Sequence, residues 1–544
     1  MFQHDATNIH ARSTITGARR FSRITGIVPS SARRSPLDPD PHFLGLHPVT
    51  VCFQSKKTLN LGFLDFSTLE KRRHFCQREL ELNRRLCPEI YLDVVPIYKS
   101  SSGFSFNEEG QVAEYAVKMK ELPHAWSARH SLGEGGFLNE LLEQNLVGEK
   151  EINRVITRLR QFYESEPPSA EIEEWGTPAK LKISTDENFI QVKPFVGKTI
   201  SPAAFDTIQH FTNGFYSANE KLFLERVEQH RIRDCHGDLH LDHIHLTPDR
   251  LSIFDCIEFN DRFRFIDIAN DLAFLAMDFD FEGRRDLANL LLRNAAREFR
   301  DPDLLKVADF YKCYRAFVRG KVESIQATEE ETANSAEHEK IAARYFQLAL
   351  QYAVRDSQPL TLVVMGRVGT GKTTVALQLG RELNWPVFSS DETRKTLAGI
   401  PLMERTAPDR REEIYSDPIT KQTFAKLVGD GLAAAKAHGG AVLDATFSRR
   451  ANRDFLREQC RRAHARLEIV ELDVDLATIR TRLAARNRSA GETSDARLED
   501  LEKLTAAYEP PTELFNSLIQ VPARGPILET TKSILLRLSR KRLS

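Results

Sequence analysis

The chain has 544 residues, too many for one hydrophobic core, and typical domain sizes of about 100–200 residues predict two to four domains. Its 76 lysines and arginines balance 77 aspartates and glutamates, so no overall basic field favours a nucleic-acid partner. The 7 cysteines are scattered without a C-x-x-C pair, which argues against a disulfide framework and favours a reducing cytoplasm. No apolar run reaches the roughly 18–20 residues of a membrane span, so we expect no membrane partner.

The first residues differ in character from the rest of the chain. Residues 1–45 are rich in arginine, serine and proline, poor in acids, and without an apolar signal-peptide core. This composition is typical of a disordered tail, with an organelle transit peptide as the alternative. We therefore expect a tail at 1–45, one domain at 46–355 and a second at 356–544.

The first domain is predicted to be α+β, with a small mixed lobe followed by a large helical lobe. A strand at 48–53, a helix at 68–86 capped by Ser67, and strands at 94–99 and 114–120 form the small lobe. Helical periodicity then dominates, interrupted by short strands at 244–246 and 251–254. The predicted helices lie at 137–166, 203–229, 267–280, 284–299, 303–322 and 331–354.

The second domain alternates strands and helices, which is typical of an α/β layer around a mostly parallel sheet. The predicted strands lie at 359–365, 385–390, 440–445, 467–474 and 517–522. The predicted helices lie at 372–384, 418–437, 450–464, 476–486 and 495–508, with a last helix at the end. We expect the joint between the two domains near 355–359.

The second domain opens with a phosphate-binding pattern. Residues 366–373 read Gly-Arg-Val-Gly-Thr-Gly-Lys-Thr, which fits G-x-x-x-x-G-K-[ST] between a predicted buried strand and a predicted helix. Glycines let backbone amides surround a phosphate, Lys372 would reach the β and γ phosphates, and the Thr373 hydroxyl could ligate Mg²⁺. The alternative is a glycine-rich turn that happens to precede a lysine. The predicted nucleotide contacts are Gly366, Gly369, Thr370, Gly371, Lys372, Thr373 and Thr374.

Two acids and two arginines complete the predicted site of this domain. Asp391 and Asp444 follow predicted strands, and ligands of open α/β sheets bind at the carboxyl ends of strands. Asp444 could hold the Mg²⁺ shell and Asp391 could bind the substrate or take its hydroxyl proton, unless both only cap helices. Arg482 and Arg486 share a helix face that could close over the triphosphate, or that simply faces solvent.

These motifs, with the segments 389–395, 442–447 and 494–496, resemble the bacterial P-loop kinases related to gluconate kinases, shikimate kinases and zeta toxins. The resemblance covers about 358–520. It implies an AAA-type ATP-binding parallel sheet with a mobile lid that phosphorylates a small hydroxyl-bearing molecule. By this resemblance Lys372, Asp391, Arg482 and Arg486 are catalytic, and the cofactors are ATP and Mg²⁺.

A second motif lies in the first domain, where residues 236–243 read His-Gly-Asp-Leu-His-Leu-Asp-His and Asp255 follows a predicted strand. Two aspartates so placed suit phosphoryl transfer, because Asp238 could orient or deprotonate a hydroxyl while Asp255 binds Mg²⁺. One alternative is a transition-metal cluster of Asp238 and Asp242 with histidines. Another is that the histidines are ordinary buried side chains. The histidines in question are His236, His240, His243 and His245.

The motif resembles the catalytic loop H-G-D-x-x-x-x-N of aminoglycoside phosphotransferases, a resemblance that covers about 47–350 and includes the segments 61–70, 82–86 and 90–97. It implies a protein-kinase-like bilobal fold in which Asp238 is catalytic and Asp255 binds metal. His243 stands where the family has a metal-binding asparagine, and Asp267 would brace the loop. Lys56 or Lys57 would pair with Glu79 to hold the α and β phosphates, with Gln54 as the alternative occupant of the lysine position.

The sequence therefore predicts a cytoplasmic, ATP- and Mg²⁺-dependent phosphotransferase in which an aminoglycoside-phosphotransferase-like domain is fused to a P-loop kinase domain. The expected partner is a small-molecule phosphate acceptor. One alternative is a nucleotide-sensing ATPase switch whose first domain is a degenerate, pseudokinase-like binding module. Another is a toxin-like kinase that acts on nucleotide sugars.

Overall fold

The computed structural model describes residues 51–58, 65–101, 103–107, 109–122, 135–328, 334–404, 406–486, 494–514 and 518–544. The predicted tail at 1–45 lies outside these residues. Contacts divide the chain into two compact units, Met1–Lys182 with Lys221–Ala308, and Ile183–Glu220 with Asp309–Ser544. The joint predicted near 355–359 lies inside the second unit. No helix in the described part of the chain combines the length and apolar character that a membrane span requires.

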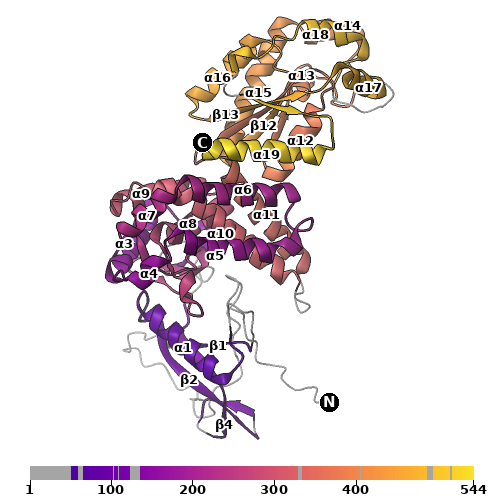
Figure 1. Ribbon diagram of the computed structural model, residues 1–544. Coiled ribbons are helices and arrows are strands. Elements are labelled where there is room, and N and C mark those ends of the chain that lie inside the picture. Colours follow the sequence, from indigo (N-terminus) through magenta and orange to yellow (C-terminus); the bar gives the residue numbers. More distant parts are fainter. Residues whose placement is uncertain are drawn as a thin grey trace, which may run out of the picture. The chain divides into compact units, whose positions relative to one another are not determined.

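The first unit begins with an antiparallel sheet in the order β1 (Val51–Ser55), β4 (Gln111–Lys120), β2 (Tyr91–Ser100), β3 (Gly103–Ser105). Helix α1 (Leu69–Arg84) packs along this sheet (Figure 1). Buried Cys76 and Leu80 of the helix meet Val117 of β4 in one apolar cluster. The helix is capped by Thr68, whose hydroxyl accepts from Lys71 N, rather than by the predicted Ser67. Ser67 instead donates its hydroxyl to Asp65.

The remainder of the first unit is largely helical, with two small sheets. Strands β5 (Gly136–Phe137), β7 (Ile244–Leu246) and β8 (Leu251–Ile253) form one sheet, and β6 (Ile232–Asp234) pairs with β9 (Phe265–Asp267). The predicted helix at 137–166 is two helices, because Asn145 adopts a φ of 57°. The helices are α2 (Leu138–Glu143), α3 (Glu149–Ser165), α4 (Ala170–Glu174), α7 (Glu220–Glu228), α8 (Ile268–Phe281) and α9 (Arg285–Glu298).

A buried ion cluster ties three distant segments of this unit together. The guanidinium of Arg226 on α7 pairs with Asp267 at the end of β9 and with Asp301, at 2.9 Å from Asp301 Oδ1. All three side chains are at most 1% exposed. The guanidinium of Arg226 thus sits between two buried carboxylates, and Asp301 has a second, longer pair with Arg231 at 3.7 Å. Removing the Arg226 guanidinium would take a directly paired cation from both buried carboxylates.

We expect Arg226→Ala to lower the free energy of unfolding of the first unit by about 3–5 kcal/mol, because it breaks a buried pair from one side. Urea denaturation followed by circular dichroism measures this change. Arg160→Ala is the matched control, because the Arg160 side chain is 43% exposed in its pair with Glu164. The prediction fails if the two substitutions destabilise the chain equally.

The second unit contains a five-stranded sheet in the order β11 (Val387–Ser389), β12 (Gly440–Asp444), β10 (Leu360–Met365), β13 (Arg466–Asp473), β14 (Leu518–Pro522). Every neighbouring pair is parallel, which confirms the predicted parallel sheet. Both β10 and β12 are buried along their whole length, as apolar central strands require. The helices are α12 (Lys372–Leu383), α13 (Ser390–Leu397), α14 (Pro408–Ile414), α15 (Asp417–His438), α16 (Arg450–Arg462), α17 (Leu476–Arg486), α18 (Leu501–Ala506) and α19 (Ile527–Leu543).

The predicted helix at 495–508 is shorter in the structure, where α18 follows a 3-10 turn at Leu498–Asp500. Asp495 explains the late start of this helix. Its buried carboxylate accepts from the backbone amide of Thr406 at 3.0 Å and from the Thr406 hydroxyl at 2.5 Å. These long-range bonds hold Asp495 outside the helix, which the local sequence pattern could not indicate.

Three helices that precede the sheet in the sequence belong to the same compact unit. Helix α6 (Pro202–Ala218) packs along α19, and α11 (Ser335–Val354) contacts α12 and α19 (Figure 1). Gln347 of α11 donates to Arg381 O at 2.9 Å, and Lys532 of α19 pairs with Asp206 of α6 at 2.5 Å. Most of α10 (Leu304–Gln326) also lies in this unit. The helical residues 309–354 and the insertion 183–220 therefore belong to the same compact unit as the sheet.

Candidate functional site

The phosphate loop of the second unit lies between the end of β10 and the start of α12, as its sequence context predicts. Gly366, Gly369 and Gly371 have φ values of 144°, 77° and 91°, which side chains with a Cβ rarely adopt. Gly371 is the N-cap of α12, so the first amides of that helix end at the loop. A helix N-terminus approached by a glycine turn is a binding site for phosphate.

The two residues that start α12 lie at the carboxyl end of the central strands. The Thr373 hydroxyl donates to Asp444 Oδ2 at 2.6 Å, and Lys372 Nζ donates to Arg367 O at 2.9 Å. Asp444 is 3% exposed; burial raises its pKa, against the lowering effects of Lys372 and Thr373. A hydroxyl and a carboxylate in contact form an oxygen donor set of the kind Mg²⁺ binds. The residues present therefore fit the expected cation.

Asp391 lies near this donor set. Strand β11 pairs with β12 so that Ser389 is opposite Asp444, and Asp391 follows in the first turn of α13. Asp391 and Glu392 both act electrostatically on Asp444 and raise its pKa. The Asp391 carboxylate is partly exposed, so a substrate could reach it. The sheet thus brings together the two acids that the strand ends predicted.

The predicted arginine pair is described only in part. The guanidinium of Arg482 donates to Thr370 O and to Ala523 O, each at 3.0 Å. These two bonds hold the phosphate loop against the segment that follows β14. The side chain of Arg486 lies outside the described residues, so a lid formed by the two arginines stays a prediction. Thr374 is exposed on the first turn of α12.

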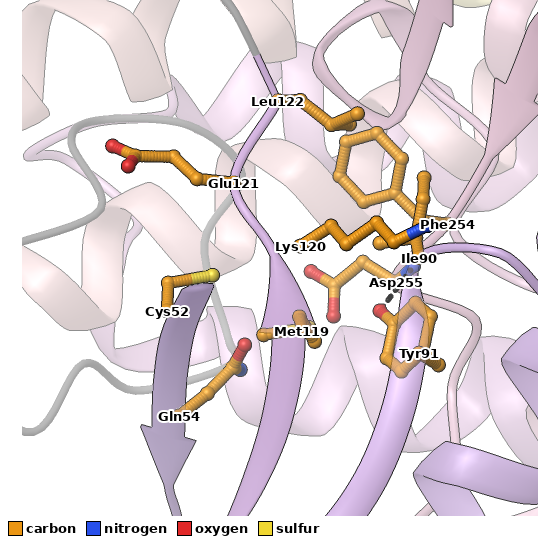
Figure 2. A pocket seen from close by; sticks show the side chains of 10 residues that line it. All are labelled: Cys52, Gln54, Ile90, Tyr91, Met119, Lys120, Glu121, Leu122, Phe254 and Asp255. Carbon is orange, nitrogen blue, oxygen red and sulfur yellow. Dashed lines mark hydrogen bonds between the residues drawn. The ribbon is translucent and has the colours of Figure 1, made fainter. Parts of the chain in front are cut away.

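The first unit contains a cavity of about 390 Å³ beside its antiparallel sheet. Gln54 of β1, Tyr91 of β2 and Lys120 of β4 line it, together with Phe254 and Asp255 after β8 (Figure 2). Its volume lies in the range of small-ligand sites, about 300–1,000 Å³. The cavity is lined by apolar side chains together with two acids, Glu121 and Asp255. This arrangement suits a flat organic ring that carries charged groups.

Lys56 is found in contact with Glu79, as the predicted pairing requires, with 2.5 Å between Nζ and Glu79 Oε2. The ammonium also pairs with Glu258, and its side chain is 0% exposed. Burial and Glu258 raise the pKa of Glu79 against the effect of Lys56. Lys56 is not among the residues that line the cavity, whereas Gln54 is. Lys57 is exposed.

Lys120 is a cavity residue that the sequence analysis missed. It is the last residue of β4, and its side chain extends across the cavity toward Phe254 and Asp255 (Figure 2). Within the described ranges its ammonium has no hydrogen-bond or ion-pair partner. The signal in the sequence was its position at the end of a predicted strand, but strand ends alone do not reveal which of them border a cavity.

The loop that carries Asp238 is held rigidly by one acid. The backbone amides of His236 and Gly237 donate to Asp271 of α8, at 3.0 Å and 2.9 Å. His236 Nε2 donates to Phe254 O at 2.9 Å, and burial lowers the pKa of this histidine to about 4. Asp267, the residue expected to brace this loop, instead caps α8 and pairs with Arg226. Asp271 was missed.

The structure brings together Asp238, His243 and Asp255. His243 Nε2 lies 3.2 Å from Asp255 Oδ2, and His243 Nδ1 lies 2.9 Å from the carbonyl oxygen of Asp238. Burial lowers the pKa of His243, but the carboxylates of Asp255 and Asp238 outweigh it and raise the pKa to about 9. The Asp238 and Asp255 side chains remain 30% and 27% exposed, so a ligand can reach both.

Two segments of the chain match known families. Residues 154–309, which include Asp238, His243 and Asp255, match the model of the phosphotransferase enzyme family. Residues 362–511, which include the phosphate loop, Asp391 and Asp444, match the model of an AAA domain. The chain is a fusion of these two regions. The match confirms the predicted order of a phosphotransferase-family region followed by a P-loop region, while the bilobal form of the first stays a prediction.

Two mycobacterial proteins align with most of this chain. Uncharacterized proteins of Mycobacterium bovis and Mycobacterium tuberculosis are 27% identical to the fusion over 454 residues, which cover 84% of this chain and 86% of theirs. Shikimate kinase of Moorella thermoacetica is 33% identical over 85 residues, which cover 16% of this chain and 48% of that enzyme.

Solved structures also align with part of the fusion. A gluconokinase from Sinorhizobium meliloti aligns with a TM-score of 0.25 and 22% identity, over 34% of this chain and 93% of its own. Shikimate kinase from Aquifex aeolicus aligns with a TM-score of 0.25 and 18% identity, over 34% of this chain and 98% of its own. These scores are too low to carry an argument about fold or function.

Proposed function

We propose that the chain is an ATP-dependent phosphotransferase that uses two nucleotide sites, one in each unit, to phosphorylate small hydroxyl-bearing molecules. The observation that carries this proposal is the contact between Thr373 and Asp444 beneath a glycine loop at the start of α12. When bound, Mg²⁺ and ATP would supply the charge-neutralising cation and the phosphoryl group. The roles of the individual residues follow from their positions.

In the second unit the loop amides and Lys372 would hold the nucleotide phosphates, while Thr373 and Asp444 hold the cation. Asp391, partly exposed beside Asp444, would bind the acceptor hydroxyl and take its proton. Arg482 keeps the loop in place through Thr370 O. Arg482 and Arg486 remain our candidates for stabilising the transition-state charge.

In the first unit Asp238 would accept the proton of the acceptor hydroxyl as its oxygen bonds to the γ phosphorus, while the bond from that phosphorus to the β–γ bridging oxygen breaks and ADP leaves. Asp255 and His243, 3.2 Å apart, would hold the cation, with one carboxylate oxygen and one imidazole nitrogen as donors. Glu79 pairs with Lys56, and both side chains are buried. Because Lys56 does not reach the cavity, we propose that Lys120 contacts the phosphates in its place.

Lys120→Ala is therefore expected to weaken nucleotide binding by the first unit about tenfold or more, since a charge-assisted hydrogen bond contributes about 1.5–3 kcal/mol. The measurement is calorimetric titration of a non-hydrolysable ATP analogue in a Lys372→Ala background, which silences the second site. Lys118→Ala is the matched control, because Lys118 lies on the same strand and does not line the cavity. Equal affinities for the two variants would contradict the role of Lys120.

The function itself is tested by transfer of labelled γ-phosphate from ATP to a panel of sugars, sugar acids, cyclitols and amino alcohols. We expect at least one labelled phosphate ester. Its formation should fall separately for Lys372→Ala and Asp238→Asn if each unit has its own acceptor. Label that appears only as inorganic phosphate, for every acceptor, would contradict the proposal.

A second candidate function is a nucleotide-sensing ATPase whose first unit binds nucleotide without transferring phosphate. The observation in its favour is the position of Lys56, which is buried between Glu79 and Glu258 while Gln54 lines the cavity. This function predicts nucleotide binding by the first unit, hydrolysis by the second, and no effect of Asp238→Asn on either. The acceptor panel distinguishes the two candidates.

A further inference from the structure

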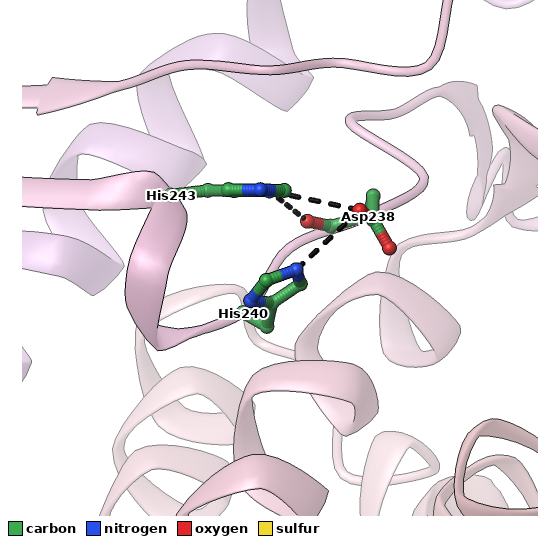
Figure 3. A group of neighbouring side chains, drawn as sticks. All are labelled: Asp238, His240 and His243. Carbon is green, nitrogen blue, oxygen red and sulfur yellow. Dashed lines mark hydrogen bonds and ion pairs between the residues drawn. The ribbon is translucent and has the colours of Figure 1, made fainter. Parts of the chain in front are cut away.

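We propose that Asp238, His240 and His243 form a binding site for a zinc-class transition-metal ion, and that occupation of this site blocks phosphate transfer by the first unit. The metal site stands on its own geometry, whereas the inhibition rests on the proposed function. Asp238, His240 and His243 offer three donor atoms that lie within 4.8 Å of one another (Figure 3). Within the described part of the chain, no other group of three or more histidine, cysteine or acidic side chains brings its donor atoms this close together.

The spacing of the donors suits a small tetrahedral ion. Asp238 Oδ2 lies 3.4 Å from His240 Nε2 and 3.7 Å from His243 Nδ1. Zinc bonds of 2.0–2.1 Å in tetrahedral geometry place two ligand atoms about 3.4 Å apart. The two imidazole nitrogens lie within 4.8 Å of each other, so an ion at the centre would draw the two rings closer together. Two imidazoles and one carboxylate form a donor set that favours zinc or a similar ion over Mg²⁺.

The ring nitrogens that face away from the donor group have acids beside them. His243 Nε2 lies 3.2 Å from Asp255 Oδ2, within reach of a hydrogen bond, whereas His240 Nδ1 lies 3.9 Å from Asp242 Oδ2, too far for one. Histidines that ligate metals usually donate their second ring N–H to a carboxylate, which fixes the tautomer and strengthens the ligand. With the proton on His243 Nε2, the lone pair on Nδ1 points toward Asp238.

His240 gives independent support, because one of its polar atoms lacks a hydrogen-bond partner. The residue is 2% exposed, and its Nε2 is buried without a hydrogen bond. A buried polar nitrogen without a hydrogen bond costs about 1–3 kcal/mol, so such atoms call for an explanation. A metal ion bound to Nε2 would satisfy it. Phosphate transfer as proposed above does not use His240.

Metal bound here would compete with the proposed transfer reaction. A metal ion at this site would bind the Asp238 carboxylate, which would then be unable to accept the hydroxyl proton. It also uses the lone pair of His243 on Nδ1, so Nε2 carries the proton and cannot hold a second cation with Asp255. The hydrogen bond between His243 Nδ1 and Asp238 O, 2.9 Å long, is given up at the same time. Zinc would thus inhibit the first unit by binding the side chains that are proposed to carry out phosphate transfer.

Direct metal binding to the full chain, without nucleotide, tests the site. Equilibrium dialysis with Zn²⁺ should show a bound ion that His240→Ala loses or binds at least about tenfold more weakly. Replacement by Co²⁺ should give the intense visible bands of a tetrahedral nitrogen–oxygen site. His245→Ala is the matched control, because His245 lies on the neighbouring strand β7 against Phe137, outside the donor group. Thermal unfolding of each variant shows whether the chain is folded.

Three results would overturn the proposal. The first is unchanged zinc affinity in folded His240→Ala, and the second is octahedral Co²⁺ bands of low intensity. The third is a thiolate charge-transfer band, which would place the ion on one of the seven cysteines. The Asp238→Asn variant provides a second test beside His240→Ala, because we expect it to lose the bound ion as well. Zinc binding without any phosphate transfer by the wild type would leave the metal site standing and refute the proposed function.

Discussion

Lys372→Ala is expected to lower phosphate transfer by the second unit about 10²–10³-fold. Lys372 starts α12 directly after the glycine loop, so its ammonium is placed to contact phosphates that bind the loop amides. Removing one such charged donor from an enclosed site typically has an effect of this size. Initial rates of transfer at saturating acceptor, together with calorimetric affinity for an ATP analogue, measure it.

Lys426→Ala is the control for this substitution, because Lys426 is an exposed lysine of α15 paired with Asp430. It should leave the rate and the affinity unchanged. A Lys372→Ala variant that keeps wild-type rate and affinity would show that the loop is only a glycine-rich turn.

Asp238→Asn is expected to lower transfer by the first unit about 10²–10⁴-fold while nucleotide affinity changes little, because an amide cannot accept the hydroxyl proton. The measurement uses a Lys372→Ala background, so that only the first unit contributes. The loop backbone should stay in place, since Asp271 holds it through the amides of His236 and Gly237.

Asp249→Asn, in the exposed turn between β7 and β8, is the matched control and should leave both the transfer rate and the nucleotide affinity unchanged. A decrease in affinity equal to the decrease in rate would assign Asp238 to binding rather than to proton transfer. No decrease in either would favour the nucleotide-sensing switch.

The second site could be predicted from sequence because its parts are local. A buried strand, the glycine loop and a helix follow one another directly, and glycine at positive φ dictates the turn. Asp444 was found because parallel strands end at one edge of the sheet, and register places its neighbour Ser389 beside it.

The first site depends on contacts between distant residues, and here prediction was incomplete. Lys56 meets Glu258, which lies on a segment far away in the sequence, and Lys56 is not among the residues that line the cavity. Asp271 looks like any acid in the first turn of a helix until the loop amides are placed beside it. Lys120 borders a cavity only because β4 lies between β1 and β2.

The helices that belong to the same unit as the P-loop sheet illustrate the same limit. The helix predicted at 203–229 is two helices, α6 and α7, whereas periodicity predicted α11 within a few residues of its bounds, since an apolar stripe shows that one face is buried. It does not show what covers that face. The partners of α6 and α11 in the second unit are α12 and α19, which come much later in the chain. The hydrogen bond from Gln347 to Arg381 O could not be predicted from the sequence of either segment alone.

The central claim is that one chain holds two separate nucleotide sites. Calorimetric titration with a non-hydrolysable ATP analogue and Mg²⁺ tests it most directly, because the stoichiometry needs no knowledge of the acceptors. Two nucleotides per chain are expected for the wild type and one for Lys372→Ala. One nucleotide for the wild type and none for Lys372→Ala would contradict the claim and leave the first unit without a nucleotide.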